Sequence, residues 1–107
     1  MQKRNAAAYR LDFVQHQMRA DRYVIPMRVR RYMRRQGWVE EVLVGSVCSL
    51  ESRDLHKSQS HASRPGVWLD VYRPPRMGGR RMYLKVTLHE NGEDVLILTF
   101  CRDGEAH

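Results

Sequence analysis

The sequence has only two cysteines, Cys48 and Cys101, and each lies in an apolar stretch. The cysteines and histidines lack the paired spacing of a zinc site, and the disulfide framework of a small secreted protein is missing. No apolar run is long enough to cross a membrane, and no hydrophobic segment follows the charged N-terminus. The sequence therefore predicts a single cytoplasmic domain, residues 1–107, with two reduced thiols.

Two other kinds of site are also missing from the sequence. No cluster of carboxylates is placed to hold Mg²⁺, which argues against a two-metal nuclease. There is no glycine-rich phosphate loop, because the "GGR" that begins at Gly78 is better explained as a hairpin turn. We therefore expect neither a metal nor a cofactor.

Positive charge is the most informative property of the chain. Its net charge is +7 and its pI is about 10.0, and residues 1–36 carry ten lysines and arginines against two aspartates. On the helix predicted for residues 27–36, Arg28, Arg31 and Arg35 form a row without interleaved acids. The row predicts contact with a polyanion. A nucleic acid is favoured over a lipid surface, because the core needs the apolar face of the helix and the helix has no Trp or Phe to anchor it in a membrane.

The N-terminal half of the sequence predicts helices. Apolar residues recur at helical spacing in residues 9–20, and residues 27–36 form a second helix that ends at Gly37. Residues 38–50 allow a helix or a strand, and their three- and four-residue apolar steps favour a helix. Residues 50–58 are expected to form a turn or a short capped element.

The C-terminal half predicts strands. Residues 66–74 and 81–90 alternate apolar and polar side chains, and Asn91-Gly92 predicts a hairpin leading into residues 94–100. Both faces of this last strand are largely apolar, so we expect it to lie centrally in the sheet. The predicted fold is α+β, with N-terminal helices packed on a small antiparallel sheet.

Reactive side chains gather around these strands. Residues 54–61 form a polar segment, predicted to be a flexible loop, with His56, Lys57 and His61. Tyr83, Lys85, Thr87 and His89 share one face of their strand, and Tyr72 and Arg73 end the strand before it. Such polar residues are also common on ordinary surfaces. A cationic and aromatic sheet face nevertheless suits RNA, because cations contact phosphates and Tyr72 or Tyr83 can stack on a base.

Metal-free RNA cleavage needs few groups. The 2′-OH of the substrate attacks the adjacent phosphorus, so one group must take its proton and another must protonate the leaving 5′-oxygen. Cations must also stabilise the additional negative charge on phosphorus. Lys57, Arg73, Tyr83 and a histidine could supply these functions, and we expect clustered cations to lower the pKa of Tyr83.

Four segments resemble the MqsR (motility quorum-sensing regulator) family of bacterial toxins. They are D-x-x-K-S at Asp54–Ser58, W-x-D-V-Y-R-P at Trp68–Pro74, Y-L-K-V-T at Tyr83–Thr87 and D-V-L-I-L-T-F at Asp94–Phe100. They stand in the family's order and at nearly its spacing. The resemblance covers residues 50–100 well and the preceding residues thinly.

The resemblance implies an mRNA interferase with a RelE-like toxin fold, the toxin of a type II toxin–antitoxin pair. Such an enzyme cuts single-stranded mRNA at short GC-containing sequences without the ribosome and so inhibits growth. The partner implied is a cognate antitoxin of the MqsA kind, often zinc-binding and DNA-binding. The family's catalytic lysine and tyrosine fall on Lys57 and Tyr83, and Arg73 falls beside them as a phosphate contact.

Two positions depart from the family pattern. Leu69 stands where the family has a glutamine implicated in activity, and His56 stands where a tyrosine is expected. Since a histidine titrates near neutral pH, His56 joins Lys57, Arg73 and Tyr83 as a catalytic candidate. The predicted RNA contacts are Arg28, Arg31, Arg35, His61, Tyr72 and Lys85.

Two other functions remain open from the sequence. The first is a non-catalytic nucleic-acid-binding regulator built around the arginine helix. The second is a RelE-type enzyme that cuts only ribosome-bound message. Cleavage of naked RNA distinguishes both from a free interferase.

Overall fold

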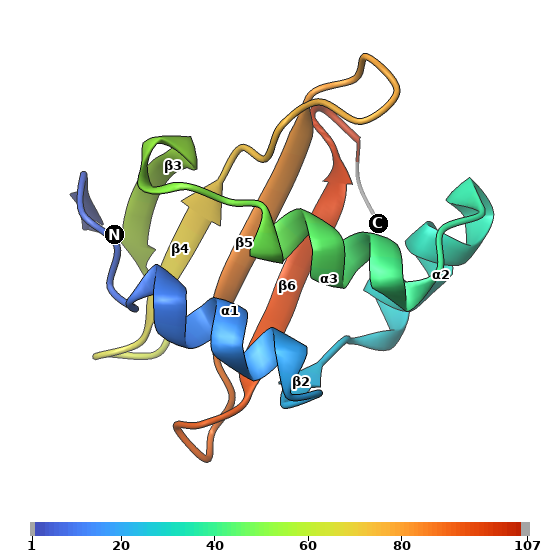
Figure 1. The fold of residues 1–107 in the computed structure, drawn as a ribbon. Coiled ribbons are helices and arrows are strands. Elements are labelled where there is room, and N and C mark those ends of the chain that lie inside the picture. Colours follow the sequence, from blue (N-terminus) through green and yellow to red (C-terminus); the bar gives the residue numbers. More distant parts are fainter. Residues whose placement is uncertain (1, 106–107) are drawn as a thin grey trace.

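The computed structural model describes residues 2–105, which form three helices and six strands around one sheet (Figure 1). The helices are α1 (Leu11–Arg19), α2 (Met27–Gln36) and α3 (Glu40–Cys48). The strands are β1 (Lys3–Arg4), β2 (Tyr23–Val24), β3 (Leu55–Ser60), β4 (Trp68–Tyr72), β5 (Met82–Leu88) and β6 (Val95–Arg102). A single 3₁₀ turn, Ser52–Asp54, has the reciprocal hydrogen bonds of a capping box and leads into β3.

The predicted helices and the C-terminal antiparallel sheet are confirmed. Residues 38–50, for which the sequence allowed a helix or a strand, contain α3. Gly37 follows α2 with a φ of 77°, the left-handed conformation that ends many helices. The chain therefore has an α+β fold, with its helices mainly N-terminal and most of its strands C-terminal.

The sheet is larger than predicted. Its strand order is β1-β3-β4-β5-β6-β2, antiparallel except where β2 runs parallel to β6. The expected flexible loop at residues 54–61 is wrong, because Leu55–Ser60 form strand β3. Polar "LHKSQS" carries no apolar alternation, yet its backbone pairs with β1 on one side and β4 on the other. Backbone pairing therefore defines this strand.

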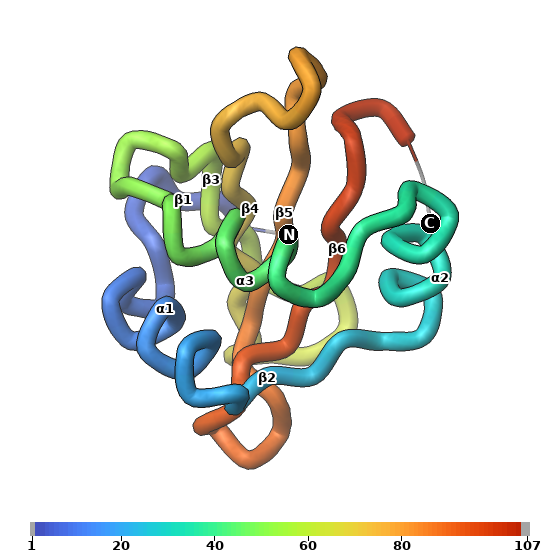
Figure 2. Tube along the Cα trace, turned by 45° about the vertical axis from the view of Figure 1, so that its right-hand side comes forward, coloured from blue at the N-terminus to red at the C-terminus, as the bar shows by residue number. Residues whose placement is uncertain are grey.

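Helices cover one face of the sheet. In Figure 1, α1 and α3 lie in front of the sheet and α2 lies beside β6, while β2 runs from α1 along the start of β6 (Figure 2). Side chains from all three helices meet Tyr72 of β4 and apolar residues of β5 and β6 in one core. Its largest fully buried side chains include Tyr32, Tyr72 and Phe100.

None of the three helices described in residues 2–105 covers the opposite face, here called the open face. Strand alternation places Lys57, Val71, Lys85 and Thr99 on it, because these residues are paired in register across β3, β4, β5 and β6. Strand β6 has neighbours on both sides, but β2 pairs only with its first residues. Leu96 and Leu98 of β6 are therefore half-buried, without a second protein layer over them.

Both cysteines are free thiols in the structure, with Cys48 half-buried and Cys101 buried. Within residues 2–105, every helix is too short or too polar to span a membrane.

Candidate functional site

The open face brings two lysines from different strands into one row. Lys57 lies opposite Val71, and Val71 lies opposite Lys85, so two strand spacings of about 10 Å in total separate the lysine backbones. The positive charge of Lys57 contributes to lowering the pKa of Lys85, after the larger effect of burial. The row therefore holds a concentrated positive charge over a sheet that fixes its position.

A second row lies at the end of the sheet where β3 and β5 begin. Arg73 follows β4, and its guanidinium forms a 2.8 Å ion pair with Asp103. Tyr83 lies opposite Cys101 on β5 and β6, two residues from Lys85 on the same face. Lys85 Nζ lies 5.9 Å from the centre of the Tyr83 ring. The two rows, together with the neighbouring His56, form the candidate site: His56, Lys57, Arg73, Tyr83 and Lys85.

His56 enters this site through an irregularity in β3. Leu55 pairs with Tyr72 and Lys57 pairs with Val71, so His56 is the additional residue of a β-bulge. Its side chain is exposed, and the charges of Arg73, Lys57 and Asp103 act on it. Burial and then Arg73 lower the pKa of His56, so the imidazole is neutral at neutral pH and can accept a proton.

The pKa of Tyr83 differs from the sequence prediction. Clustered cations were expected to lower it, and this expectation is wrong. Desolvation by burial raises the pKa of Tyr83 above its ordinary value, and the opposing effect of Arg73 is smaller. The phenol is therefore protonated at neutral pH and is suited to donating a proton.

Helix α2 meets the candidate site through Arg28. The Arg28 guanidinium donates a 2.6 Å hydrogen bond to the carbonyl of Leu98. Leu98 has no partner on β5, because Lys85 pairs with Thr99 and Val86 pairs with Ile97. Arg28 also contributes to lowering the pKa of Lys85, which shows that the helix adds charge to the open face.

Two predicted RNA contacts on α2 lie farther along the helix. Arg31 and Arg35 are exposed, and the Arg35 guanidinium lies 5.8 Å from the centre of the Tyr32 ring. They share a helix face with Arg28 at steps of three and four residues. The arginine row therefore leads away from the open face.

Tyr72 does not lie on the open face. Its side chain is only 2 % exposed and packs in the core under the helices. Burial raises its pKa to about 12. The prediction that Tyr72 stacks on RNA is wrong, since the strand alternation that places Val71 and Arg73 on the side of the open face turns Tyr72 inward.

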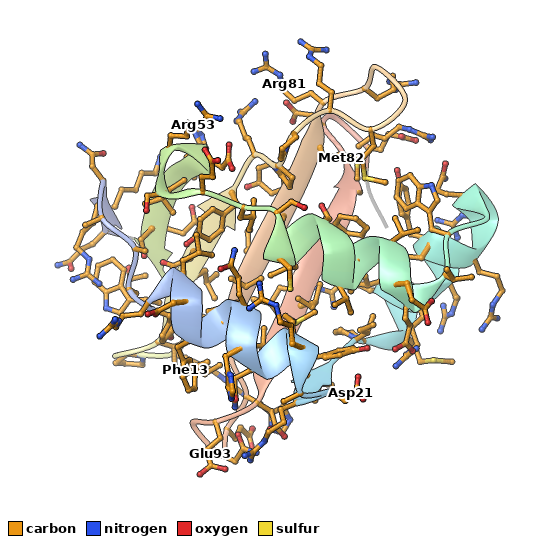
Figure 3. All side chains as sticks on the ribbon, viewed as in Figure 1. Phe13, Asp21, Arg53, Arg81, Met82 and Glu93 are labelled. Carbon is orange, nitrogen blue, oxygen red and sulfur yellow. The ribbon has the colours of Figure 1, made fainter. Side chains whose placement is uncertain are left out.

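His61 lies apart from the candidate site. It follows β3 and lines a hollow at the opposite end of the open face, and its Nδ1 accepts a 3.1 Å hydrogen bond from the amide of Ser63. Figure 3 shows Arg53 and Arg81 projecting from the other end, where β3 and β5 begin. The open face thus has a cationic end and a hollowed end.

Sequence reasoning missed Asp103 and the hollow. Asp103 lies just beyond β6, and only the folded sheet brings it to Arg73. The half-buried leucines of β6 were a signal for the hollow, but they were interpreted as evidence for a central strand. Among the described residues, no group of three His, Cys, Asp or Glu side chains is arranged to hold a metal ion.

Residues 6–102 match a protein-family model, described as "Motility quorum-sensing regulator, toxin of MqsA". The match includes every residue of the candidate site and all three helices. A comparison with curated proteins found no match.

Proposed function

This chain belongs to the motility quorum-sensing regulator (MqsR) family of toxins, and from that premise we propose that it is an mRNA interferase. Family membership makes it the toxin of a toxin–antitoxin pair, with an antitoxin of the MqsA kind as its partner. The proposed activity goes further: the protein cuts single-stranded mRNA, and this cleavage inhibits translation and growth.

The observation that carries the proposal is the grouping of Lys57, Lys85, Arg73, Tyr83 and His56 on one uncovered sheet face. Among residues 2–105, Asp103 is the one acid that forms an ion pair with this group, through Arg73, so the site keeps a net positive charge. Such a surface attracts the phosphates of RNA, and a rigid sheet holds the cations where charge develops during cleavage. The site is therefore suited to stabilising a phosphorane.

The opposite pKa shifts of His56 and Tyr83 suggest how the proton moves. Neutral His56 takes the proton of the 2′-OH, and the resulting alkoxide attacks the adjacent phosphorus. Protonated Tyr83 donates its proton to the 5′-oxygen as the bond from phosphorus to that oxygen breaks. The products are a 2′,3′-cyclic phosphate and a 5′-hydroxyl. These two residues suffice for both proton transfers, so the reaction needs no metal-bound hydroxide.

The cations have a separate role in this mechanism. Lys57 and Arg73 lie next to the proposed base and acid, and they stabilise the additional negative charge on the phosphorane oxygens. Lys85 and Arg28 contact neighbouring phosphates from β5 and α2. Asp103 holds the Arg73 guanidinium in one orientation, which reduces the entropy that Arg73 loses when RNA binds.

Several finer expectations from the resemblance remain predictions. They are cleavage at GC-containing sequences, independence from the ribosome, a cytoplasmic location, and an antitoxin that binds zinc and DNA. Leu69 replaces the family's glutamine, so the base preference of this protein has to be measured.

The proposal is tested by incubating the purified protein with a naked mRNA, with and without ribosomes, and mapping the fragment ends. We expect discrete cuts in naked RNA that form far more slowly with Lys57→Ala and Tyr83→Phe. Cuts only in the presence of ribosomes would indicate a RelE-type enzyme. Intact RNA under both conditions would overturn the proposed activity.

A further inference from the structure

We propose that the hollow at the far end of the open face is the subsite for a nucleobase of the RNA. The inference rests on the proposed function for the identity of its ligand. The hollow has a volume of about 530 Å³, within the range of small-molecule sites. It lies between the segment after β3 and the hairpin that joins β5 to β6.

The floor of the hollow is apolar. Leu69 of β4 and Leu96 and Leu98 of β6 line it, and all three lie on the sheet face that no helix covers. Leu69 is only 8 % exposed, while the two leucines of β6 are half-buried. A sheet face turned to water normally carries polar side chains at these positions. A flat apolar surface inside a hollow can bury the face of a base.

The rim of the hollow carries hydrogen-bonding groups. His61 and Arg64 come from the segment after β3, and His89 and Glu90 come from the hairpin. The nearest Arg64 and Glu90 atoms are 3.8 Å apart, a loose and exposed ion pair that a ligand can replace. Imidazole and guanidinium planes stack on bases, and these groups together offer donors and acceptors to a base edge.

Two hydroxyl groups in the wall are already engaged. Tyr9 and Thr87 both donate to the carbonyl of Trp68, at 3.0 and 2.8 Å. Since both hydroxyl protons are used, the donors to a base edge come from the rim.

The hollow adjoins the catalytic residues along continuous strands. Leu69 precedes Val71 by two residues, and Leu98 precedes Thr99, which lies opposite Lys85. Two residues of a strand span about 7 Å, a distance comparable with the reach from a phosphate to a nearby base. A nucleotide whose phosphate lies at Lys57 and Lys85 can therefore place a base in the hollow.

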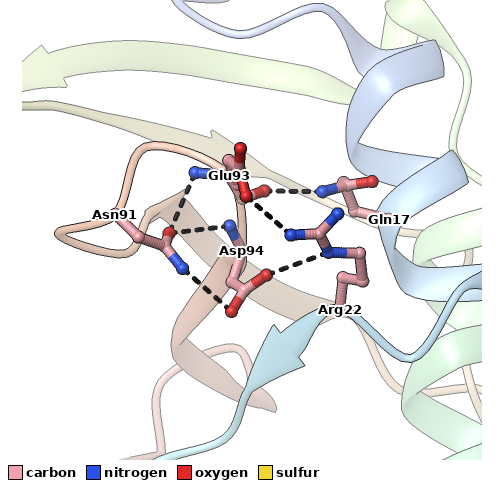
Figure 4. Close-up of polar contacts among 5 residues, drawn as sticks. All are labelled: Gln17, Arg22, Asn91, Glu93 and Asp94. Atoms are coloured by element: carbon pink, nitrogen blue, oxygen red, sulfur yellow. Dashed lines mark hydrogen bonds and ion pairs between the residues drawn. The ribbon is translucent and has the colours of Figure 1, made fainter.

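The hairpin side of the rim is fixed before any ligand binds (Figure 4). The Asn91 side-chain oxygen accepts hydrogen bonds from the amides of Glu93 and Asp94, at 2.9 and 3.0 Å. Arg22 pairs with both acidic side chains, and Gln17 donates to the carbonyl of Glu93. Since a preformed site loses little conformational entropy on binding, this anchoring favours a ligand subsite.

The test is an NMR titration of the ¹⁵N-labelled protein, first with inorganic phosphate and then with each nucleoside 3′-monophosphate. Phosphate should shift the amides of the candidate site. At least one nucleotide should also shift the amides of residues 61–67, 87–92 and 96–98. Identical shifts for phosphate and for all four nucleotides would overturn the inference, even for a protein that cuts RNA.

Variants separate the base subsite from the catalytic residues. Leu96→Trp fills the hollow and Arg64→Ala changes its exposed rim, so each should weaken the selected nucleotide by about tenfold or more. Both should retain the phosphate-induced shifts. Leu11→Trp is the matched control, because Leu11 is a half-buried leucine of α1, which covers the opposite face of the sheet. This variant should bind the nucleotide as the wild type does. Wild-type affinity in both hollow variants would contradict the inference.

Cleavage provides the second readout. In Leu96→Trp, the base found at the cut sites should change or lose its preference. If the wild type cuts RNA and Leu96→Trp cuts it with the same base preference and rate, the base subsite is overturned and the interferase activity stands. If nucleotides shift the amides around the hollow but the wild type cuts no RNA, the base subsite stands and the proposed function is overturned.

Discussion

Arg73 and Asp103 form a 2.8 Å ion pair at the end of the sheet, and both charges act on the two groups proposed for proton transfer. The charge of Arg73 acts to lower the pKa of His56 and opposes the rise that burial causes in the pKa of Tyr83, whereas Asp103 acts to raise both values. One ion pair thus adjusts the proposed base and the proposed acid together. Asp103 comes from beyond β6, so this coupling exists only in the folded protein.

The first prediction concerns this coupling. In Asp103→Asn the pKa of His56 should fall below its wild-type value, because the acid that raised it is gone while Arg73 remains. An NMR titration of the His56 ring measures the change. Asp12→Asn removes a carboxylate whose ion pair is with Arg10, so it is the control and should leave the pKa of His56 unchanged. A rise of the His56 pKa in Asp103→Asn would contradict the assignment.

The second prediction concerns pH. Cleavage should increase as pH rises through the pKa of His56, which lies below the ordinary histidine value, because the base must be neutral. Because burial raises the pKa of Tyr83, cleavage should decrease only above the ordinary tyrosine range, where Tyr83 loses the proton that it must donate. We therefore expect a plateau at roughly pH 7–9 in initial rates corrected for background hydrolysis.

Variants assign each part of this pH profile to a residue. His56→Ala should be slower by about 10²- to 10⁴-fold and should lose the decrease on the acid side. Tyr83→Phe should be slower and should lose the decrease on the alkaline side. A His56→Ala enzyme with an unchanged acid profile would show that another group is the base.

The third prediction compares two lysines near the open face. Lys57→Ala should reduce cleavage by about 10²- to 10³-fold, because the cation beside the phosphorane is lost. Lys3→Ala is the comparison, since Lys3 lies on β1 opposite Gln59 at the sheet edge and lowers the pKa of His56 less than Lys57 does. It should change the rate only slightly. Equal losses in both variants would mean that general positive charge, not position, supports cleavage.

The fourth prediction concerns the arginine row of α2. Arg31→Ala and Arg35→Ala should each make RNA binding less salt-dependent, lowering the slope of log affinity against log salt by about 0.7. Arg30→Ala is the control, because Arg30 already pairs with Glu40 within the protein. Each arginine variant is combined with Lys57→Ala, which slows cleavage. Its binding to a single-stranded RNA is then measured at several salt concentrations. Unchanged slopes in both exposed-arginine variants would place the RNA elsewhere.

The fifth prediction concerns the anchor of the N-terminal segment. Asp70 is 1 % exposed, and its carboxylate accepts hydrogen bonds from the amides of Ala8 and Tyr9, at 2.9 and 3.0 Å. In Asp70→Asn one of these amides loses its acceptor, so the free energy of unfolding should fall by about 1–3 kcal/mol. Urea denaturation measures the loss. The exposed change Glu90→Gln, at a loose 3.8 Å ion pair, should alter stability by less than about 0.5 kcal/mol, and a similar value for Asp70→Asn would contradict the account.

The spacing of apolar residues and the turn residues predicted those helices and strands in which these signals are strong. The helical spacing of residues 9–20, the glycine after α2 and the alternation of β5 each appear in the structure. Strand β3 was missed, because a strand between two partners does not need alternating apolar side chains. Two-residue strands such as β1 and β2 leave no periodic pattern and depend on their partners.

The site was predictable only in part for a similar reason. The sequence placed Tyr83 and Lys85 on one strand face, and the structure agrees. The sequence could not show that Tyr72 turns into the core. Which face of β4 meets the face of Tyr83 and Lys85 depends on the register between β4 and β5, and the sequence alone does not give that register. The effect of burial on Tyr83 was likewise invisible, because desolvation depends on which atoms surround the ring.

The central claim is that the 2′-OH of the RNA attacks the phosphorus on the open face. The most direct test uses two oligonucleotides of one cleaved sequence, one of them with a single 2′-deoxy sugar at the mapped cut site, incubated with the protein in EDTA. We predict cleavage of the all-RNA strand, with a 2′,3′-cyclic phosphate at the new end, and an intact bond in the 2′-deoxy strand. Equal cleavage of both strands at that bond would contradict the account.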